Sequence, residues 1–490
     1  MPEPTLFEIS KANRRGVRYP EPDVPEADFP QDFLREELPL PEISEHEVIR
    51  HFTNISQYNH GVDIGFYPLG SCTMKYNPKV NEDVARLPGF AFIHPLQPPE
   101  TVQGALGLMY ELQEWLGEIS GFTDVGLQPA AGAHGELTGV LIIRAYHRDR
   151  GDEKRTKMLI PDSAHGTNPA TSAMSGMEVV ELPSDERGNV DLEALKSECD
   201  DTLAGIMITN PNTLGLFDEN IVEACRLVHE AGGLVYGDGA NMNALLGKCK
   251  PAQTGIDVMH FNLHKTFSTP HGGGGPGSGP VGVVPELADF LPSPVVVRTE
   301  EGDEDNPPFY DFHTPEKTIG RVKAFHGHFG MFVRAFTYMI TLGKEGLRDV
   351  AESAVLNANY LRALIKDSYN IPFDRICMHE FVAQGEWEDA PDIRALDVSK
   401  RMMDFGFHPP TNYFPLIVHE ALMIEPTETE TKETLDEVAQ VMKRIAKEAR
   451  EEPEKLKTAP HNTPFGRLDE VKAAKDLVLT TSLPEDYGED

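Results

Sequence analysis

Residues 257–282 read DVMHFNLHKTFSTPHGGGGPGSGPVG, a short apolar run followed by a glycine-rich loop. The run is typical of a buried strand, and it ends at His264 and Lys265. Seven glycines follow within the stretch, and backbone without side chains can approach a ligand closely. A lysine at a strand end beside such a loop is a candidate for Schiff-base formation with an aldehyde. The alternative interpretation is a solvated lysine next to a flexible surface loop.

Strand and helix patterns alternate along the chain from Gly126 onward. Strands are predicted at 157–161, 178–183, 204–210, 233–239, 257–263 and 279–285, and helices at 102–119, after residues 131–136 to about 147, and at 219–230. This alternation is the signature of an α/β fold with a doubly wound, mostly parallel sheet. Ligands bind beyond the carboxyl ends of the strands in such sheets, so the residues just past each strand are the site candidates.

The two ends of the chain differ from this central region. Residues 1–41 hold eight prolines among alternating charges, which favours an extended arm or a disordered tail. An acidic loop at 299–308 precedes a small α/β unit, for which we predict helices around 331–342 and at 352–366 and 431–449, and strands at 375–383, 413–418 and 421–425. The tail 451–490 has no clear period and is predicted to be irregular.

Side chains with complementary chemistry follow successive predicted strands. Gly132, Ala133 and His134 open a helix whose free N–H groups could bind a phosphate. His165 follows the next strand, where an imidazole could stack on a flat ring, although a lone loop histidine is usually solvated. Asn210 offers a side-chain donor, but Asn-Pro is also a plain turn signal.

Asp238 ends an apolar strand, where a carboxylate is costly unless it meets a cation such as a protonated pyridine nitrogen. Lys265 stands one strand further on. A lysine for an aldehyde, an aspartate for a ring nitrogen, a helix N-terminus for a phosphate and a flat side chain over a ring together predict a pyridoxal 5'-phosphate site. The glycines do not support two other nucleotide sites. No Gly-Lys-Ser/Thr triplet follows residues 272–275, and the G-x-G-x-x-G match at 277–282 precedes a strand rather than a helix.

Charge and composition exclude several classes of protein. The net charge is −35, which repels a phosphate backbone and an anionic membrane surface, so we expect neither nucleic acid nor membrane as a partner. No apolar run is long enough to span a bilayer, and the first residues lack the order of a secretory signal, so the prediction is a cytoplasmic protein. The five cysteines are widely spaced and never form a CxxC pair, which indicates neither a metal site nor a disulfide framework.

The negative charge also predicts how stability depends on salt. Self-repulsion among the carboxylates is relieved by screening, a property that suits a high-salt cytoplasm. We therefore expect the melting temperature to climb as salt is raised from low to molar concentration, as thermal unfolding monitored by circular dichroism would measure. A flat salt profile would mean that the acidity has another cause.

Nine segments of the sequence carry a resemblance to a known family. They are FYPLGSCTMKYNP (66–78), HPLQP (94–98), LQPAAGAHGE (127–136), SAHGTNPA (163–170), TNPNTLGLF (209–217), YGDGANMNA (236–244), NLHKTFSTPHGGGGPGSGP (262–280), LNANYL (356–361) and LMIEPTETE (422–430). With these segments the chain resembles the glycine dehydrogenase (decarboxylating) family, the P-protein of the glycine cleavage system, and in particular its separate second subunit. The implied fold is the aspartate aminotransferase type (fold type I), with an N-terminal arm and loop segment over 1–100, a large cofactor domain over 101–325 and a small C-terminal α/β domain over 326–490.

The resemblance also implies roles for individual residues. Lys265 matches the Schiff-base lysine, Asp238 the partner of the pyridine nitrogen and His165 the ring-stacking histidine, and these three are the expected catalytic residues. The expected cofactor-binding set adds Gly132, Ala133 and His134 at the phosphate, His264 beside the lysine, and Asn210.

The implied activity is pyridoxal phosphate-dependent decarboxylation of glycine, with transfer of the aminomethyl group to the lipoyl group of the H-protein. Single-chain members of the family contain two similar halves, of which only the second holds the lysine. This implies a first P-protein subunit as partner, with two copies of each chain. Two alternatives stay open: another fold type I decarboxylase or aminotransferase, which would turn over without a lipoyl carrier, and a non-catalytic subunit, against which Lys265 argues.

Overall fold

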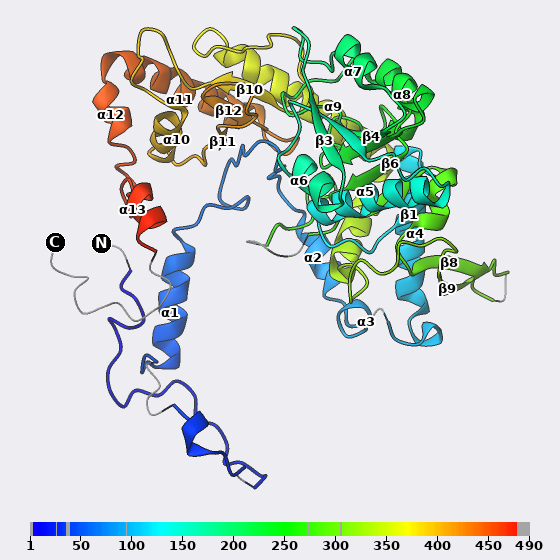
Figure 1. The fold of residues 1–490 in the computed structure, drawn as a ribbon. Helices are drawn as coiled ribbons and strands as arrows, with labels where there is room; N and C mark the ends of the chain where they lie inside the picture. Colours follow the sequence, from blue (N-terminus) through cyan, green and yellow to red (C-terminus); the bar gives the residue numbers. More distant parts are fainter. Residues whose placement is uncertain are drawn as a thin grey trace.

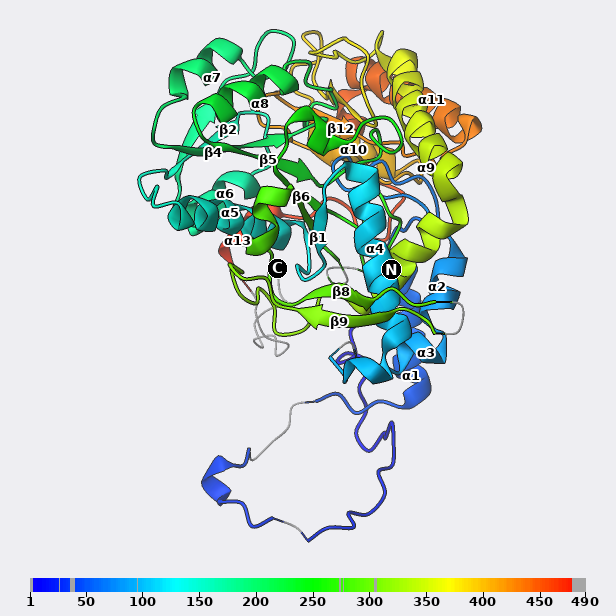
Figure 2. The ribbon, with the colours of Figure 1, turned by 90° about the vertical axis from the view of Figure 1, so that its right-hand side faces the viewer.

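The computed structural model describes residues 3–25, 27–35, 40–94, 96–272, 275, 277–303 and 306–477. Two sheets with their helices form the body of the molecule, and an N-terminal arm followed by helix α1 (Glu45–Ser56) extends away from it (Figures 1 and 2). Apart from the short 3-10 helix Gln31–Phe33, the described residues before α1 form no helix or strand. Among the described residues, no helix has the length and apolar character needed to cross a membrane.

A seven-stranded sheet forms the centre of the larger part. Its strand order is β1-β7-β6-β5-β4-β2-β3, and only β7 runs antiparallel to its neighbours. The strands are β1 (Asp124–Gly126), β2 (Lys157–Pro161), β3 (Glu178–Leu182), β4 (Leu203–Thr209), β5 (Leu234–Gly239), β6 (Val258–Phe261) and β7 (Val281–Val283). The six strands predicted from the sequence are confirmed, as is the doubly wound, mostly parallel sheet.

Successive residues of a strand point to opposite faces of the sheet, so both faces carry apolar side chains, and helices cover both of them. Leu159 packs in a core with helices from one face, whereas Met158 and Ile160 pack in a second core with helix α5 on the other. The helices are α4 (Gln103–Ser120), α5 (Gly132–Asp149), α6 (Thr167–Met174), α7 (Leu192–Glu198) and α8 (Ile221–Glu230), with the shorter α2 (Lys79–Ala85) and α3 (Pro88–Ala91) before them. The predicted helices at 102–119 and 219–230 are thereby confirmed, as is the helix predicted to run to about 147, which begins earlier than predicted, at Gly132.

A three-stranded antiparallel sheet with its own apolar core forms the smaller part. Its order is β10 (Phe381–Gln384), β12 (Ala421–Ile424) and β11 (Thr411–Asn412), and helices α10 (Ala395–Met403) and α11 (Lys432–Glu451) pack beside it. The long helix α9 (Phe329–Ile365) connects the two sheets. Helical geometry breaks once in α9, at Gly343, whose φ of 62° favours glycine. The domain boundaries at 100/101 and 325/326 stay a prediction.

Two sequence predictions in the smaller part need correction. The strand predicted at 413–418 is wrong: the segment turns, Leu416 is 84% exposed, and the place beside β12 belongs to β11. Pro415 explains this, because it has no N–H to give to a ladder. The strand predicted at 375–383 begins only at Phe381. In the larger part, the loop predicted at 299–308 connects strands β8 (Val295–Glu300) and β9 (Phe309–His313), a hairpin beside α4 that the sequence analysis missed.

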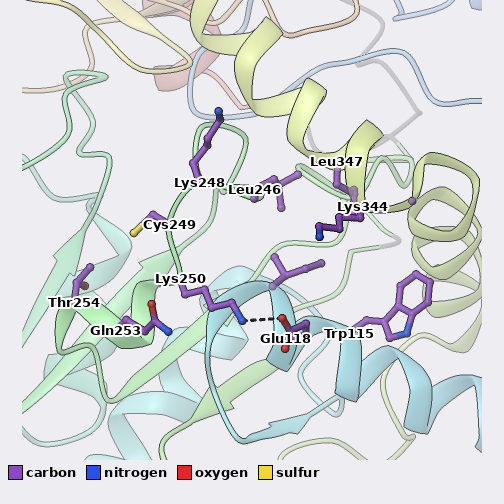
Figure 3. A pocket seen from close by; sticks show the side chains of 13 residues that line it. Trp115, Glu118, Leu246, Lys248, Cys249, Lys250, Gln253, Thr254, Lys344 and Leu347 are labelled. Carbon is purple, nitrogen blue, oxygen red and sulfur yellow. Dashed lines mark hydrogen bonds and ion pairs between the residues drawn. The ribbon is translucent and has the colours of Figure 1, made fainter.

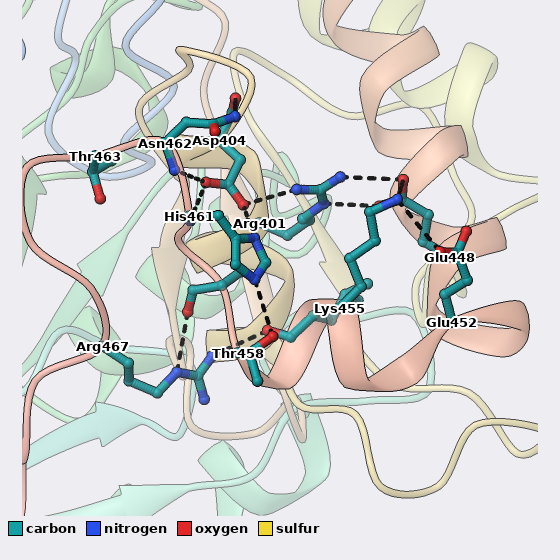
Figure 4. Close-up of polar contacts among 12 residues, drawn as sticks. Arg401, Asp404, Glu448, Glu452, Lys455, Thr458, His461, Asn462, Thr463 and Arg467 are labelled. Atoms are coloured by element: carbon teal, nitrogen blue, oxygen red, sulfur yellow. Dashed lines mark hydrogen bonds and ion pairs between the residues drawn. The ribbon is translucent and has the colours of Figure 1, made fainter.

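The tail is also more ordered than predicted. It contains α12 (Pro453–Lys457) and α13 (Glu470–Lys475), while residues 478–490 lie outside the described residues. Leu456 of α12 packs in the apolar core of the smaller part, and ion pairs and hydrogen bonds hold the residues around and after it (Figure 4). Asp404 accepts the backbone N–H of Asn462 at 2.8 Å and lies 2.9 Å from Nδ1 of His461, and Arg467 pairs with Asp397 at 2.8 Å. Polar contacts of this kind leave no hydrophobic period for sequence analysis to detect.

Candidate functional site

Lys265 lies in the turn that follows β6, at the carboxyl end of the parallel strands. Its backbone N–H donates to the carbonyl of Asn262 at 3.0 Å, and the next residue, Thr266, accepts a hydrogen bond from the backbone N–H of Met242 at 2.8 Å. The turn is therefore fixed on both sides. The side chain is half-buried, and its Nζ has no hydrogen bond or ion pair among the described residues. A free amine on a fixed turn is available for covalent chemistry.

Asp238 near the end of β5 is 4% exposed and lies beside Thr209 of β4 and His260 of β6 in the sheet register. Its carboxylate accepts the N–H of Ala240 at 2.9 Å and the amide of Asn168 at 3.1 Å, and Nε2 of His260 is 3.5 Å away. Burial opposes ionisation, but His260, His165 and these donors outweigh it, and the pKa of Asp238 is lowered. Asp238 is therefore a buried carboxylate.

Glu136 on α5 is a site residue that the sequence analysis missed. It is 4% exposed, and its carboxyl group accepts hydrogen bonds from the amide of Asn168 and the hydroxyl of Thr167, both at 2.9 Å. Asn168 thus bridges Glu136 and Asp238. Burial and the nearby charge of Asp238 raise the pKa of Glu136 to about 7. Its place one turn after Gly132, on the helix face toward the sheet, was the available signal.

Helix α5 begins at Gly132, so the N–H groups of Gly132, Ala133 and His134 have no partner within the helix. A Cβ atom added to Gly132 would lie 2.7 Å from Oδ1 of Asn262, so a larger residue here would displace the Asn262 side chain. The imidazole of His134 accepts the N–H of Ala130 at 3.1 Å and stabilises the turn into the helix. This end of α5 can bind an anion.

Several buried polar atoms around these residues have no hydrogen-bond partner among the described residues. They are Oδ1 of Asn262, Nε2 of His260, Oγ1 of Thr209, Oγ1 of Thr269 and Oγ of Ser278. Each belongs to a strand end or to the turns beside Lys265. Buried polar groups are normally paired, so such a concentration marks a place where a polar ligand is expected.

His165 lies in the turn between β2 and α6, and the two residues that its side chain contacts lie outside the seven-stranded sheet. Its Nε2 is 2.9 Å from Oγ of Ser71, and its ring stacks on Phe414 with centroids 5.0 Å apart and planes at 17°. Burial lowers the pKa of His165, so the imidazole is neutral. A flat neutral ring is thus held beside Asp238 and Lys265, and its stacking on a cofactor stays a prediction.

Two further predicted residues take different positions. His264 adjoins the lysine: its Nδ1 accepts the N–H of Ser278 at 3.2 Å, its ring meets His271 edge-on at 5.3 Å, and burial lowers its pKa to about 3. Asn210 instead closes a loop, because its amide accepts from the N–H of Asp218 at 3.0 Å and donates to the carbonyl of Asp218 at 3.5 Å. No contact among the described residues links Asn210 to the other predicted residues, so its cofactor role stays a prediction.

A separate hollow of about 830 Å³ lies between α4, the loop after β5 and α9 (Figure 3). Trp115, Leu246 and Leu347 are among its apolar lining residues, and Lys250 at its edge pairs with Glu118 at 2.8 Å. None of the predicted site residues lines it. The strand-end site and this hollow are therefore distinct.

Two family models match the chain. The model described as aminotransferase class-V matches residues 140–274, which include His165, Asp238 and Lys265, and the model described as glycine dehydrogenase, C-terminal domain, matches residues 350–464. Solved structures with this fold include a glycine decarboxylase (P-protein) of the glycine cleavage system in inhibitor-bound form (TM-score 0.72, 21% identity, 85% of this chain and 93% of that chain). Another is the glutamate decarboxylase of Lactobacillus brevis (TM-score 0.62, 12% identity, 87% and 96%). The fold is the aspartate aminotransferase type, fold type I of the pyridoxal phosphate-dependent enzymes, as predicted.

Relatives in sequence define the family more narrowly. The chain is 60% identical over 479 residues to the "Probable glycine dehydrogenase (decarboxylating) subunit 2" of Caldanaerobacter subterraneus subsp. tengcongensis, which covers 97% of this chain and 98% of the relative. It is 57% identical over 477 residues to the protein of the same name from Thermotoga maritima, with 97% and 99% covered. The chain therefore belongs to the family of glycine dehydrogenase (decarboxylating) subunit 2, which confirms the resemblance seen in its motifs.

Proposed function

We propose that this chain is the lysine-bearing subunit of an enzyme that decarboxylates glycine and passes the aminomethyl group to the lipoyl group of an H-protein. The observation that carries the proposal is the free amine of Lys265 one strand away from the buried carboxylate of Asp238, in a chain 60% identical to a glycine dehydrogenase subunit 2. No specific observation favours a decarboxylase or aminotransferase with another substrate.

The residues at the strand ends fit pyridoxal 5'-phosphate. The N-terminus of α5 at Gly132, Ala133 and His134 would hold the phosphate, Lys265 the aldehyde carbon, and Asp238 the ring nitrogen. The unpartnered atoms of Asn262 and Ser278 supply further polar contacts beside them. When bound, the group supplies a carbon that reacts with amines and a protonated ring that withdraws electrons as CO2 leaves.

The chain's own residues keep that ring protonated. Asp238 is ionised and cannot turn away, because Ala240 and Asn168 fix both of its oxygens. A buried carboxylate attracts a proton on the facing nitrogen more strongly than a solvated one, since little water screens it. Glu136, joined to Asp238 through Asn168, has a raised pKa, which avoids a second full charge beside the first. The flat ring of His165 would cover one face of the cofactor.

The proposed partners follow from the family. The relatives are named as second subunits, which implies a first subunit, and we propose an assembly with two copies of each chain. The lipoylated H-protein enters for a chemical reason. After CO2 leaves, the electron pair that bound it needs an electrophile; the lipoyl disulfide accepts it, and one sulfur leaves as a thiol. Without that disulfide the pair can only take up a proton or recapture CO2.

We expect the isolated chain to be a poor catalyst that exchanges CO2 with the glycine carboxyl slowly at best. Full activity should need both a homologous first subunit and a lipoylated carrier, because one completes the assembly and the other accepts the aminomethyl group. Exchange of labelled CO2 and aminomethyl transfer would be measured for the chain alone, with carrier, and with carrier plus first subunit. Full turnover by the chain alone would favour an ordinary amino-acid decarboxylase instead.

A further inference from the structure

Two buried glutamates of the smaller part face the site from the side opposite the strand ends. Glu380 directly precedes β10 and Glu425 directly follows β12, and Phe381 pairs with Ile424 in the antiparallel ladder. The sheet register therefore places Glu380 and Glu425 opposite each other. One oxygen of each carboxyl group and one ring nitrogen of His379 lie within 4.8 Å of one another. Glu380 is 4% exposed and Glu425 is 0% exposed.

The donors around the two carboxyl groups are unequal. Glu425 accepts the N–H of Thr73 at 3.0 Å and its hydroxyl at 2.9 Å, and the amides of Asn241 at 2.9 Å and Asn243 at 3.3 Å. Among the described residues, Glu380 accepts one hydrogen bond, from the N–H of Ser71 at 2.7 Å, and Nε2 of His379 is 3.6 Å away. Four donors stabilise a negative charge on Glu425, whereas Glu380 has little to balance one. Both oxygens of Glu425 already accept hydrogen bonds, which favours a proton rather than a metal ion as the positive charge of the pair.

Both glutamates hold a loop with unusual backbone geometry. Ser71 and Thr73 have φ angles of 69° and 52°, in the left-handed region that side chains disfavour. Such conformations persist when the surroundings impose them, and here the two carboxyl groups bind the N–H groups of these same residues. Ser71 then reaches across the site with its hydroxyl, 2.9 Å from Nε2 of His165. A chain of contacts thus leads from Glu380 through Ser71 to the histidine.

We propose that Glu380 and Glu425 hold a single proton between them, with Glu425 ionised and Glu380 protonated, and that this pair is a positioning unit that fixes Ser71 and through it His165. The role of His165 against the cofactor rests on the proposed function. The shared proton does not, because it follows from the register, the burial and the donors alone. Neither glutamate is placed in contact with substrate.

Other groups facing the pair support this distribution of charge. His379 is neutral, because burial lowers its pKa to about 3, and burial keeps the thiol of Cys72 protonated by raising its pKa. The ammonium group of Lys265 is the facing cation. Burial and then the charge of Glu425 raise the pKa of Glu380. Burial also raises the pKa of Glu425, to about 7, but the hydrogen bonds from Asn241 and Thr73 and the charge of Lys265 oppose that shift, so Glu425 releases its proton before Glu380 does.

The sign of the pH dependence follows from the raised pKa of Glu380. The unfolded chain releases the proton of Glu380 near the ordinary pKa of a glutamate, whereas the folded chain keeps it up to the raised pKa. Stability is therefore fully present below the ordinary pKa and is lost as pH rises up to and through the raised one. Replacing Glu380 by glutamine keeps the neutral form at every pH, and its carbonyl can still accept from Ser71.

The test measures thermal unfolding of the cofactor-free chain from about pH 6 to about pH 9, and the dissociation constant of pyridoxal phosphate by absorbance, for four variants. We expect the alkaline decline in melting temperature to be shallower in Glu380→Gln than in the wild type, and its cofactor affinity to stay within about threefold. Glu425→Gln should weaken cofactor binding by about tenfold or more, because four donors lose their anion. Ser71→Ala should weaken it by about tenfold while keeping the wild-type pH profile of stability.

Glu437→Gln on the exposed face of α11 makes the same change in charge and serves as the control that should match wild type. Glu136 and Glu425, whose pKa values are both raised to about 7, titrate in the same range and leave a residual decline in Glu380→Gln. An alkaline decline as steep in Glu380→Gln as in the wild type would overturn the shared proton, even if Glu425→Gln fails to fold. Wild-type cofactor affinity in Ser71→Ala would overturn the link to His165. Glycine is absent throughout, so neither result depends on which substrate the enzyme takes.

Discussion

Lys265→Ala protein is expected to fold normally and to carry no pyridoxal phosphate that borohydride can fix. The Lys265 ammonium group has no hydrogen bond or ion pair among the described residues, so its removal costs little stability. The turn around it is held by the backbone hydrogen bond to Asn262 and by the hydroxyl of Thr266, which accepts from the N–H of Met242, and the substitution leaves both intact. Loss of the amine nevertheless removes the one group that can bond the aldehyde at this place.

Borohydride reduction followed by peptide mass spectrometry would measure the adduct, and thermal unfolding would measure the fold. Lys344→Ala removes an exposed lysine from α9 and is the matched control that should keep a full adduct. An adduct found on a lysine other than Lys265 in the wild-type chain would refute the assignment of the whole site.

Asp238→Asn should retain bound cofactor but lose glycine decarboxylation by about a hundredfold or more, in the fully assembled enzyme. A neutral amide cannot hold the ring proton through its charge, and the N–H of Ala240 and the amide of Asn168 would face an amide where they now meet an anion. Cofactor absorbance and labelled CO2 exchange, measured side by side, separate binding from turnover.

Asp257→Asn is the control for this change. Asp257 lies at the opposite end of β6, where it accepts the N–H of Val235 at 2.7 Å and contacts His229 at 2.8 Å. Its substitution should lower stability and leave turnover per folded enzyme intact. Unchanged turnover in Asp238→Asn would remove Asp238 from the ring nitrogen.

The candidate residues that could be predicted from the sequence, such as Asp238 and Lys265, are those whose position follows from the strand that directly precedes them. Asp238 and Lys265 each follow an apolar run, and parallel strands end at one edge, so their neighbourhood follows from local pattern alone. Glu136 was not predicted as a candidate residue, because its contact with Asn168 depends on how α5 packs on the sheet. Ser71 and Glu380 are 309 positions apart in the chain, and nothing local predicts that they meet.

Predictions that failed did so where polar contacts or a proline override an apolar pattern. The apolar residues at 413–418 suggested a strand, but Pro415 cannot join a ladder and Phe414 packs on His165 instead. Asn210 has the right chemistry and follows the right strand, yet its amide is bonded to the backbone of Asp218. The sequence shows that a residue such as Asn210 can donate a hydrogen bond, but only the fold determines which group accepts it.

Helix α9 has a consequence for how the site receives its ligands. Beyond Gly343 the same helix packs Leu347 and Ala351 into the core of the seven-stranded sheet and Leu361 and Ile365 into the core of the three-stranded sheet. This part of α9 is thus packed into both cores. A movement of the smaller part that carries Glu380 and Glu425 relative to Lys265 must therefore bend the helix. A binding site that is already held in this way loses little conformational entropy when a small ligand binds. More of the favourable interaction energy therefore appears as binding affinity.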